Sequence, residues 1–256
     1  MELYYRKLGN GPPLIILHGL FGMSDNWLSI ASRIAERHTV YIPDQRNHGR
    51  SPNNDRFNYQ VLVDDLMQFM NLHSLNSVRL IGHSMGGKVA MQAAIKYPEK
   101  FTKLVVVDIA PKKYATHFFK SLLEQLTKIN LDRVKSYSEV NEQMALKISS
   151  PLIRQFVLKN LYRDEQHNFR WRIDLNSINN NIDSIVDSSV YGGVYEDDTL
   201  FIRGGESEYV LDSDMPNIKT IFPNAQVYTI PLATHWVHSD APDDLCAVLG
   251  DFLHDA

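Results

Sequence analysis

The chain has 256 residues, and its 26 lysines and arginines against 30 aspartates and glutamates give a formal net charge of −4. This small acidic excess argues against nucleic acid as the main ligand, and 44% hydrophobic with 22% charged residues excludes a largely disordered chain. The longest aliphatic runs, Leu14–Leu17 and Leu104–Val107, are far shorter than the ~18 residues that indicate a membrane span.

The first nine residues mix tyrosines with Arg6 and Lys7 and contain no apolar stretch of the kind that a secretory signal needs. We therefore expect a cytoplasmic protein without a membrane span. The single cysteine, Cys246, excludes an internal disulfide and a cysteine zinc cluster, and its apolar helical surroundings indicate a packing role. Because no phosphate loop or dinucleotide fingerprint is present, we expect no cofactor.

Short aliphatic runs alternate with longer segments of helical period, which is the pattern of a parallel sheet covered by helices. Met1–Leu8 predicts an antiparallel edge strand. The buried strands expected after it are Leu14–Leu17, Val40–Pro43, Val78–Ile81, Leu104–Asp108, Leu200–Arg203 and Val227–Ile230. The helices expected in this core are Trp27–Glu36, Tyr59–Leu72, Met85–Tyr97 and Asp243–Leu253.

Residues 112–194 break this alternation with charge-rich helical segments. The segments are Phe118–Ile129, Val140–Ile148 and Leu152–Asn160. Since strand-like runs resume at Leu200, the insertion interrupts one sheet. We therefore expect an α/β core at residues 1–111 and 195–256, and a helical cap over a site at residues 112–194. Candidate apolar walls for that site are Tyr114, Phe118, Phe119 and Trp171, although packing between cap helices explains each equally well.

The strand Leu14–Leu17 runs into a His18-Gly19 turn, a pattern that fits a loop binding an oxyanion. We expect His18 itself to be a structural hydrogen-bonding group. After the next strand, Asp44 and Arg46 are predicted to pair within a buried turn and to bond the loop backbone. No carboxylate and histidine recur there at ligand spacing, so a metal site formed with His18 is disfavoured and none is expected.

A Gly82-x-Ser84-x-Gly86 pattern stands at the end of a predicted strand and the start of a helix. A nucleophile on such a sharp turn needs small neighbours because the backbone is strained there. The turn lifts the serine oxygen clear of the sheet. The helix N-terminus and the Met85 amide then face the same place, where they would stabilise a developing oxyanion. Ser84 is the predicted nucleophile.

The base is predicted on the loop after the last strand, which contains two histidines. His235 follows Ile230 by five residues and precedes the terminal helix, so its imidazole can swing toward Ser84 and accept the serine proton. His238 is the alternative. Its position near Ser239 and Asp240 favours a place at the start of the helix, and we therefore choose His235.

The acid that orients the histidine departs from the usual sequence pattern. Spacing from Gly204 places Ser207 where an aspartate is expected. A hydroxyl can hydrogen-bond an imidazole but cannot compensate its positive charge. Another carboxylate is therefore required, and Glu206 and Glu208 flank this position as reserve candidates.

Asp108 is the preferred acid. It closes the valine-rich run Leu104–Asp108, one strand after the nucleophile, and so lies at the same edge of the sheet as Ser84. A carboxylate that ends a buried run is costly unless it meets a partner, which favours a functional role. Capping of the following turn is the structural alternative.

These motifs resemble the α/β-hydrolase superfamily, through His18-Gly19, the loop Asp44–Ser51, Gly82–Gly86 and the late histidine. The segments Val106–Pro111 and Arg203–Tyr209 make the chain similar to the YbfF-type esterases and their mitochondrial relatives. This resemblance implies Asp108 as the acid, Leu20 and Met85 as oxyanion amides, and Ser207 assisting near the histidine. It also implies activity on short-chain esters, with acyl thioesters as suspected substrates.

We therefore predict a serine carboxylesterase for small or medium acyl esters, or acyl thioesters, acting through Ser84, His235 and Asp108. One alternative keeps the fold but uses the serine as a base, in a carbon–carbon hydrolase or lyase. Another is a small-molecule receptor without catalysis. No pattern in the sequence indicates an oligomeric state.

Overall fold

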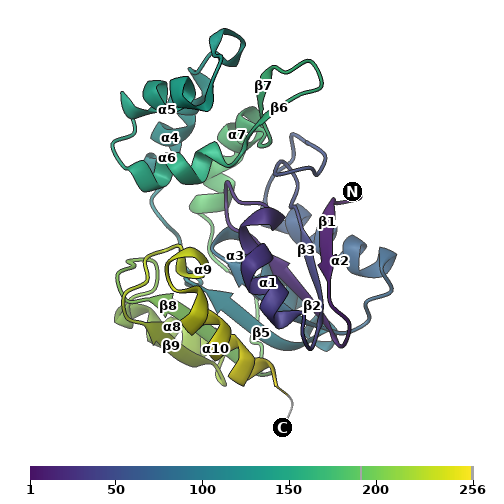
Figure 1. Ribbon diagram of the computed structural model, residues 1–256. Coiled ribbons are helices and arrows are strands. Elements are labelled where there is room, and N and C mark those ends of the chain that lie inside the picture. The colour runs from purple at the N-terminus through teal and green to yellow at the C-terminus, as the bar shows by residue number, and fades with distance from the viewer. Residues whose placement is uncertain (191, 255–256) are drawn as a thin grey trace.

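The computed structural model describes residues 1–190 and 192–254. A seven-stranded sheet with the order β1-β3-β2-β4-β5-β8-β9 runs through the molecule (Figure 1). The edge strand β1 pairs antiparallel with β3, and the other described pairings within this sheet are parallel. The strands are β1 (Tyr5–Leu8), β2 (Pro13–Leu17), β3 (Thr39–Pro43), β4 (Val78–His83), β5 (Phe101–Val107), β8 (Thr199–Gly204) and β9 (Gln226–Ile230).

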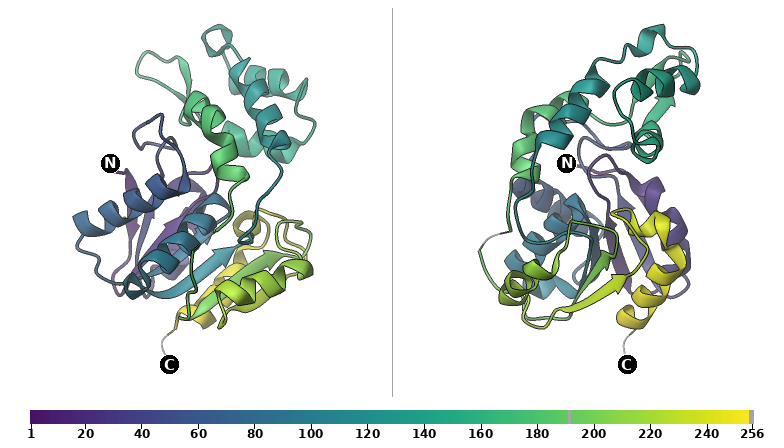
Figure 2. Two further views of the ribbon diagram at one scale, coloured as in Figure 1. Left: turned by 180° about the vertical axis from the view of Figure 1, so that it is seen from behind. Right: turned by 90° about the vertical axis from the view of Figure 1, so that its left-hand side faces the viewer.

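Helices cover both faces of this sheet. On one face lie α1 (Leu28–Ile34) and α10 (Pro242–Leu253), and on the other α2 (Tyr59–Leu72), α3 (Met85–Lys96) and α8 (Met215–Ile221) (Figure 2). Along β5, Val105 and Val107 pack on the side of α1 and α10, whereas Leu104 and Val106 pack on the side of α2, α3 and α8. Because such a strand is buried on both faces, its sequence is a continuous aliphatic run.

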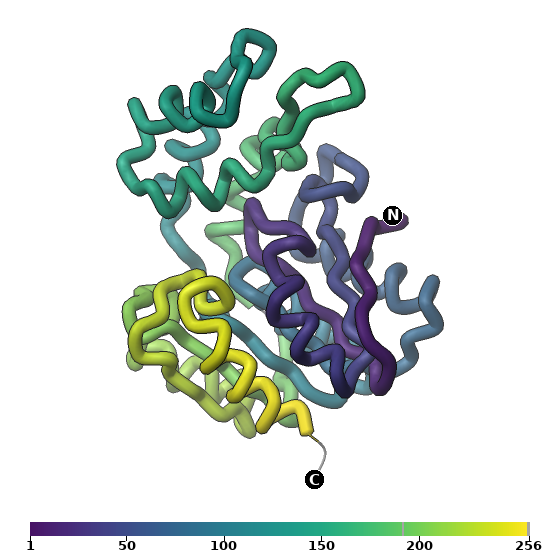
Figure 3. The backbone as a smooth tube through the Cα atoms, in the orientation of Figure 1, coloured from purple at the N-terminus to yellow at the C-terminus, as the bar shows by residue number. Residues whose placement is uncertain are grey.

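The insertion lies between β5 and β8 and stands at one end of the sheet (Figures 1 and 3). It contains the antiparallel hairpin of β6 (Leu161–Arg163) and β7 (Phe169–Trp171). Its helices are α4 (His117–Thr127), α5 (Tyr137–Ala145), α6 (Pro151–Leu158) and α7 (Leu175–Val186).

Polar caps explain where the insertion helices begin. The Ser136 side chain accepts a hydrogen bond from the Glu139 amide at the start of α5, and Asp174 accepts one from the Ser177 amide at the start of α7. At α6, Ser150 is followed by Pro151, whose fixed φ suits the first helical position.

The predicted fold class is confirmed, and the expected strands and helices differ from the observed ones by a few residues at their ends. The expectation that strands stop within the insertion is wrong, because the β6–β7 hairpin lies there. Helices α7 and α8 and the short α9 (Val237–Asp240) were not predicted. Within the described residues, no helix has both the length and the apolar character that crossing a membrane requires.

Candidate active site

Ser84 occupies the sharp turn between β4 and α3. Its backbone has φ 53° and ψ −118°, a conformation that L-residues rarely adopt. A side chain on Gly82 would place its Cβ 2.3 Å from the Gly86 oxygen, and one on Gly86 would lie 2.4 Å from the Leu17 oxygen. Both positions therefore require glycine. The turn presents the Ser84 hydroxyl at the end of the sheet.

His235 lies on the loop between β9 and α9, within hydrogen-bonding distance of two predicted site residues. Its Nε2 is 3.0 Å from Ser84 Oγ, and its Nδ1 is 2.8 Å from Asp108 Oδ2. With Nδ1–H donating to the carboxylate, Nε2 is free to accept the serine proton. The structure thus brings Ser84, His235 and Asp108 into one hydrogen-bonded series.

Two residues without a role in the sequence prediction hold His235 in place. The ring of Tyr209 stacks on the imidazole at a centroid distance of 3.7 Å and an interplanar angle of 16°. His83 Nε2 donates to the His235 carbonyl oxygen at 2.8 Å. Burial holds the pKa of His83 well below its usual value, so this ring stays neutral at physiological pH.

Asp108 is completely buried at the end of β5, where its φ of 50° turns the chain out of the strand. The amide of Gly204 donates to Oδ1 at 2.9 Å, and the Ser207 hydroxyl donates to Oδ2. These donors and His235 compensate the buried carboxylate. Ser207, expected to assist near the histidine, lines a cavity together with His235 and donates to the carboxylate that bonds the imidazole, and its assisting role stays a prediction.

The alternative base, His238, is buried in the short helix α9. Its ring stacks on Trp27 at 4.8 Å and 17°, and burial lowers its pKa to about 4. The reserve acids Glu206 and Glu208 line a cavity beside His235. Among the described residues, Asp108 is the acid whose carboxylate bonds the His235 ring.

The His18-Gly19 turn packs directly on the serine turn. A Cβ on Gly19 would lie 3.1 Å from Ser84 Cβ. His18 is buried, donates from Nδ1 to the Gly19 oxygen at 2.8 Å and accepts the Gln45 amide at 2.9 Å, and burial lowers its pKa to about 4. This geometry agrees with a structural histidine. Leu20 and Met85 line one cavity with Ser84, and the oxyanion role of their amides stays a prediction.

Known proteins resemble this chain in sequence and in structure. A model of the α/β-hydrolase fold family matches residues 12–242. The chain belongs to the α/β-hydrolase family. It is 35% identical to the sn-1-specific diacylglycerol lipase ABHD11 of Danio rerio over 96% of this chain and 79% of that one. Esterase YbfF of Escherichia coli is 28% identical over 96% of this chain and 94% of its own.

Among solved structures, a marine microorganism esterase superimposes with a TM-score of 0.95 and 42% identity. The match covers 98% of this α/β hydrolase and 99% of the esterase. The expected resemblance to YbfF-type esterases is therefore confirmed.

Two cavities of this α/β hydrolase meet at Ser84. The large cavity, about 400 Å³, is also lined by His235, Trp236 and apolar side chains of the insertion. Those side chains are Phe118, Phe119 and Leu122 from α4 and Ile153, Phe156 and Val157 from α6. The small cavity, about 30 Å³, is lined by Ser84, Met85 and Lys88 of the serine turn and α3, and by Tyr114.

The structure thus places three of the candidate apolar walls at the site. Phe118 and Phe119 line the large cavity, and Tyr114 lines the small one. Trp171 in β7 instead lines a separate hollow with Asn130 and Arg170.

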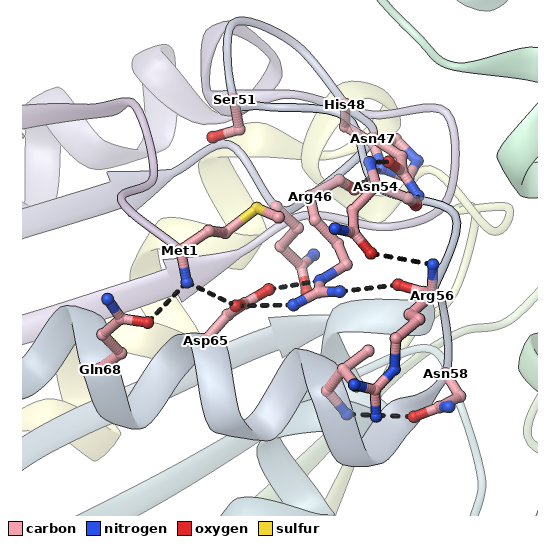
Figure 4. Close-up of polar contacts among 12 residues, drawn as sticks. Met1, Arg46, Asn47, His48, Ser51, Asn54, Arg56, Asn58, Asp65 and Gln68 are labelled. Atoms are coloured by element: carbon pink, nitrogen blue, oxygen red, sulfur yellow. Dashed lines mark hydrogen bonds and ion pairs between the residues drawn. The ribbon is translucent and has the colours of Figure 1, made fainter.

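The predicted pairing of Asp44 with Arg46 is wrong. Arg46 forms a two-pronged ion pair with Asp65 of α2, at 2.5 Å from Nε and 2.8 Å from Nη2, and also donates to the Arg56 oxygen at 2.7 Å (Figure 4). Asp44 accepts the amides of Ser24 at 2.6 Å and Arg50 at 2.8 Å. The expected bonding of Asp44 to loop backbone is therefore observed, with α2 supplying the partner for Arg46.

Proposed function

We propose that this α/β hydrolase is a serine carboxylesterase in which Ser84 is the nucleophile, His235 the base and Asp108 the orienting acid. The relatives named as esterases or lipases, and the esterase structure, support the class of carboxylic ester hydrolase. The observation that carries the assignment of residues is the hydrogen-bonded series from Ser84 Oγ through both His235 nitrogens to Asp108 Oδ2.

In the first half-reaction, the Ser84 oxygen attacks the ester carbonyl carbon while its proton passes to His235 Nε2. The carbonyl oxygen becomes an oxyanion beside the N-terminus of α3, where the Leu20 and Met85 amides donate to it. The carbon–oxygen bond to the alcohol then breaks. The departing alcohol takes the proton from His235, and the acyl group stays on Ser84.

In the second half-reaction, water attacks the acyl group as its proton moves to His235. The carbon–oxygen bond to Ser84 breaks, and His235 returns the proton to the serine oxygen. Asp108 stabilises the imidazolium that forms in both halves. Ser207 acts as a positioning residue, because its hydroxyl and the Gly204 amide hold the carboxylate toward His235 Nδ1.

We further propose that residues 112–194 form a cap that shapes the substrate site. Their α4 and α6 contribute the apolar walls of the large cavity, so burial of an apolar substrate group there would remove it from water. Substrates in this proposal are esters or thioesters of small or medium acyl groups.

Steady-state hydrolysis of a p-nitrophenyl ester by the wild-type and Ser84→Ala proteins tests this function, together with labelling by a fluorophosphonate. We expect one label per chain in the wild type, none at position 84 in the variant, and turnover by the wild type alone. Labelling without turnover of any ester would favour a receptor. Wild-type rates in Ser84→Ala would contradict the serine mechanism.

A further inference from the structure

Lys88, in the second turn of α3, is a buried lysine that forms no ion pair with a carboxylate of the described residues. It is 1% exposed, and its ammonium lies 4.9 Å from the ring centre of Tyr114 and 5.8 Å from that of Tyr59. Across residues 1–190 and 192–254, its one hydrogen-bond acceptor is the carbonyl oxygen of Ser188. The carboxylate of Asp187 attracts Lys88 and opposes the lowering of its pKa only in part, because Asp187 is half-exposed and pairs with Lys113 at 3.4 Å.

A buried ammonium is costly unless it is paired. Burial accordingly lowers the pKa of Lys88 to about 7. An ammonium has three N–H groups, and the Ser188 carbonyl occupies one of them. A bound anion would use the remaining donors and would favour the charged form.

Lys88 is also placed to reach a substrate on Ser84. The two residues are four apart along α3, a rise of about 6 Å, and positions four apart share one face of a helix. Long helical side chains point back toward the N-terminus, which here is the Ser84 end. Consistent with this direction, Ser84, Met85 and Lys88 all line the small cavity.

The position of His235 determines which part of an ester enters each cavity. The departing alcohol must lie beside His235 Nε2 to receive its proton. His235 lines the large cavity, whereas the small cavity is lined by Ser84 and Met85 without it. The alcohol side therefore lies in the large apolar cavity, and the acyl chain extends into the small one.

The size of the small cavity limits the anion. Its volume of about 30 Å³, against about 400 Å³ for the large cavity, suits a short acyl chain with a small terminal group such as a carboxylate. Two of the phenol groups that line it are already used, since Tyr59 donates to the Ile185 oxygen and Tyr114 donates to the Tyr209 oxygen. Lys88 is the charged donor among the residues that line this cavity.

We propose that the small cavity binds the terminal carboxylate of a short acyl chain, with Lys88 as its counter-ion. The substrates would be half-esters of short dicarboxylic acids such as succinic acid, because Ser84 and Lys88 line the same small cavity. This inference rests on the proposed esterase function. It adds a binding residue and a substrate class to that function.

The test compares monobenzyl succinate with benzyl 4-methylpentanoate, in which an isopropyl group replaces the carboxylate at nearly the same volume. The measured quantity is the ratio of kcat/KM for the half-ester to kcat/KM for the neutral ester. We expect this ratio to fall about 30-fold or more in Lys88→Met, as loss of a charge-assisted contact in a dry site predicts. Lys96→Met makes the same change of charge at an exposed position of α3 that lines neither cavity, and it should retain the wild-type ratio.

An equal ratio in the wild-type and Lys88→Met proteins would overturn the proposal, as would wild-type preference for the neutral ester. A second measurement is the calorimetric binding of both esters to Ser84→Ala, which does not depend on whether the Lys88→Met protein folds. Tighter binding of the half-ester supports the carboxylate site, and equal binding contradicts it. Preferential binding without wild-type turnover of either ester would contradict the esterase function while keeping the anion site.

Discussion

The ring of Tyr209 lies parallel to the imidazole of His235, with 3.7 Å between the ring centres. The two residues come from the loops that follow adjacent strands β8 and β9. The Tyr209 amide also donates to Ser207 Oγ at 3.2 Å, and Ser207 donates to Asp108. Tyr209 therefore contacts the proposed base, His235, with its ring, and its backbone contacts Ser207, which bonds the proposed acid.

We predict that the flat ring of Tyr209 positions His235. Tyr209→Leu removes the stacking surface but keeps the backbone contact with Ser207, and kcat should fall about tenfold with little change in KM. Tyr209→Phe keeps the ring and should stay close to wild type. Steady-state kinetics on a p-nitrophenyl ester measures both. Equal losses in the two variants would contradict a role of the ring.

Asp108 is predicted to be the acid that the mechanism requires. Asp108→Asn should lower kcat by about 10³-fold or more, because the amide favours the wrong histidine tautomer and cannot stabilise the imidazolium. Glu206→Gln, a change of the same kind at the cavity wall, should remain within a few-fold of wild type. A larger loss of kcat in Glu206→Gln than in Asp108→Asn, measured in steady-state assays, would instead assign the acid to the loop after β8.

The buried histidines predict a loss of stability in acid. In the folded protein, burial lowers the pKa of His238 to about 4 and that of His48 to about 3, whereas an unfolded histidine titrates near 6.5. Between pH 6.5 and 4 the unfolded chain therefore binds more protons, and the free energy of unfolding falls as the pH falls. Above pH 6.5 this contribution is fully retained.

His238→Phe isolates one of these groups, since phenylalanine keeps a ring against Trp27 but cannot be protonated. Urea unfolding at several pH values should show that the free energy of unfolding falls less steeply with decreasing pH in this variant than in the wild type. It should also hydrolyse esters at close to the wild-type rate. Identical pH slopes would contradict the burial argument, and loss of turnover would return His238 to consideration as the base.

The ion pair of Arg46 and Asp65 is predicted to hold the loop after β3 against α2. Arg46→Met leaves a buried carboxylate without its main partner and should lower the free energy of unfolding by about 3–5 kcal/mol. The double variant Arg46→Met with Asp65→Leu should recover most of that loss. Denaturant unfolding measures both, and a double variant as unstable as the single one would rule out this explanation.

The site residues differ in how much of their placement the sequence could reveal. Ser84 and His235 follow predicted strands at the spacing that is typical of a nucleophile and a base. Asp108 follows a buried run of valines, where a charge is costly unless it meets a partner. His83, Tyr209 and Lys88 carry no such signal. Their contacts to His235 and Ser188 join residues far apart in sequence, and only the folded chain brings them together.

The missed elements have similar physical reasons. The asparagines of α7 resemble a loop, yet Leu175, Ile178, Ile182 and Ile185 follow helical spacing and are buried. The strands β6 and β7 have three residues each, too few to show alternation. The predicted partner of Arg46 was the nearby Asp44, since the position of α2 against this loop depends on tertiary packing that leaves no local pattern in the sequence.

The most direct test of the central claim is to trap the acyl group on the serine. Wild-type protein is mixed with p-nitrophenyl butyrate, quenched in acid within the first turnover, digested and analysed by mass spectrometry. The account predicts that the peptide containing Ser84 carries the added mass of one butyryl group. Full ester turnover with that peptide unmodified, or with the acyl group on another residue, would contradict it.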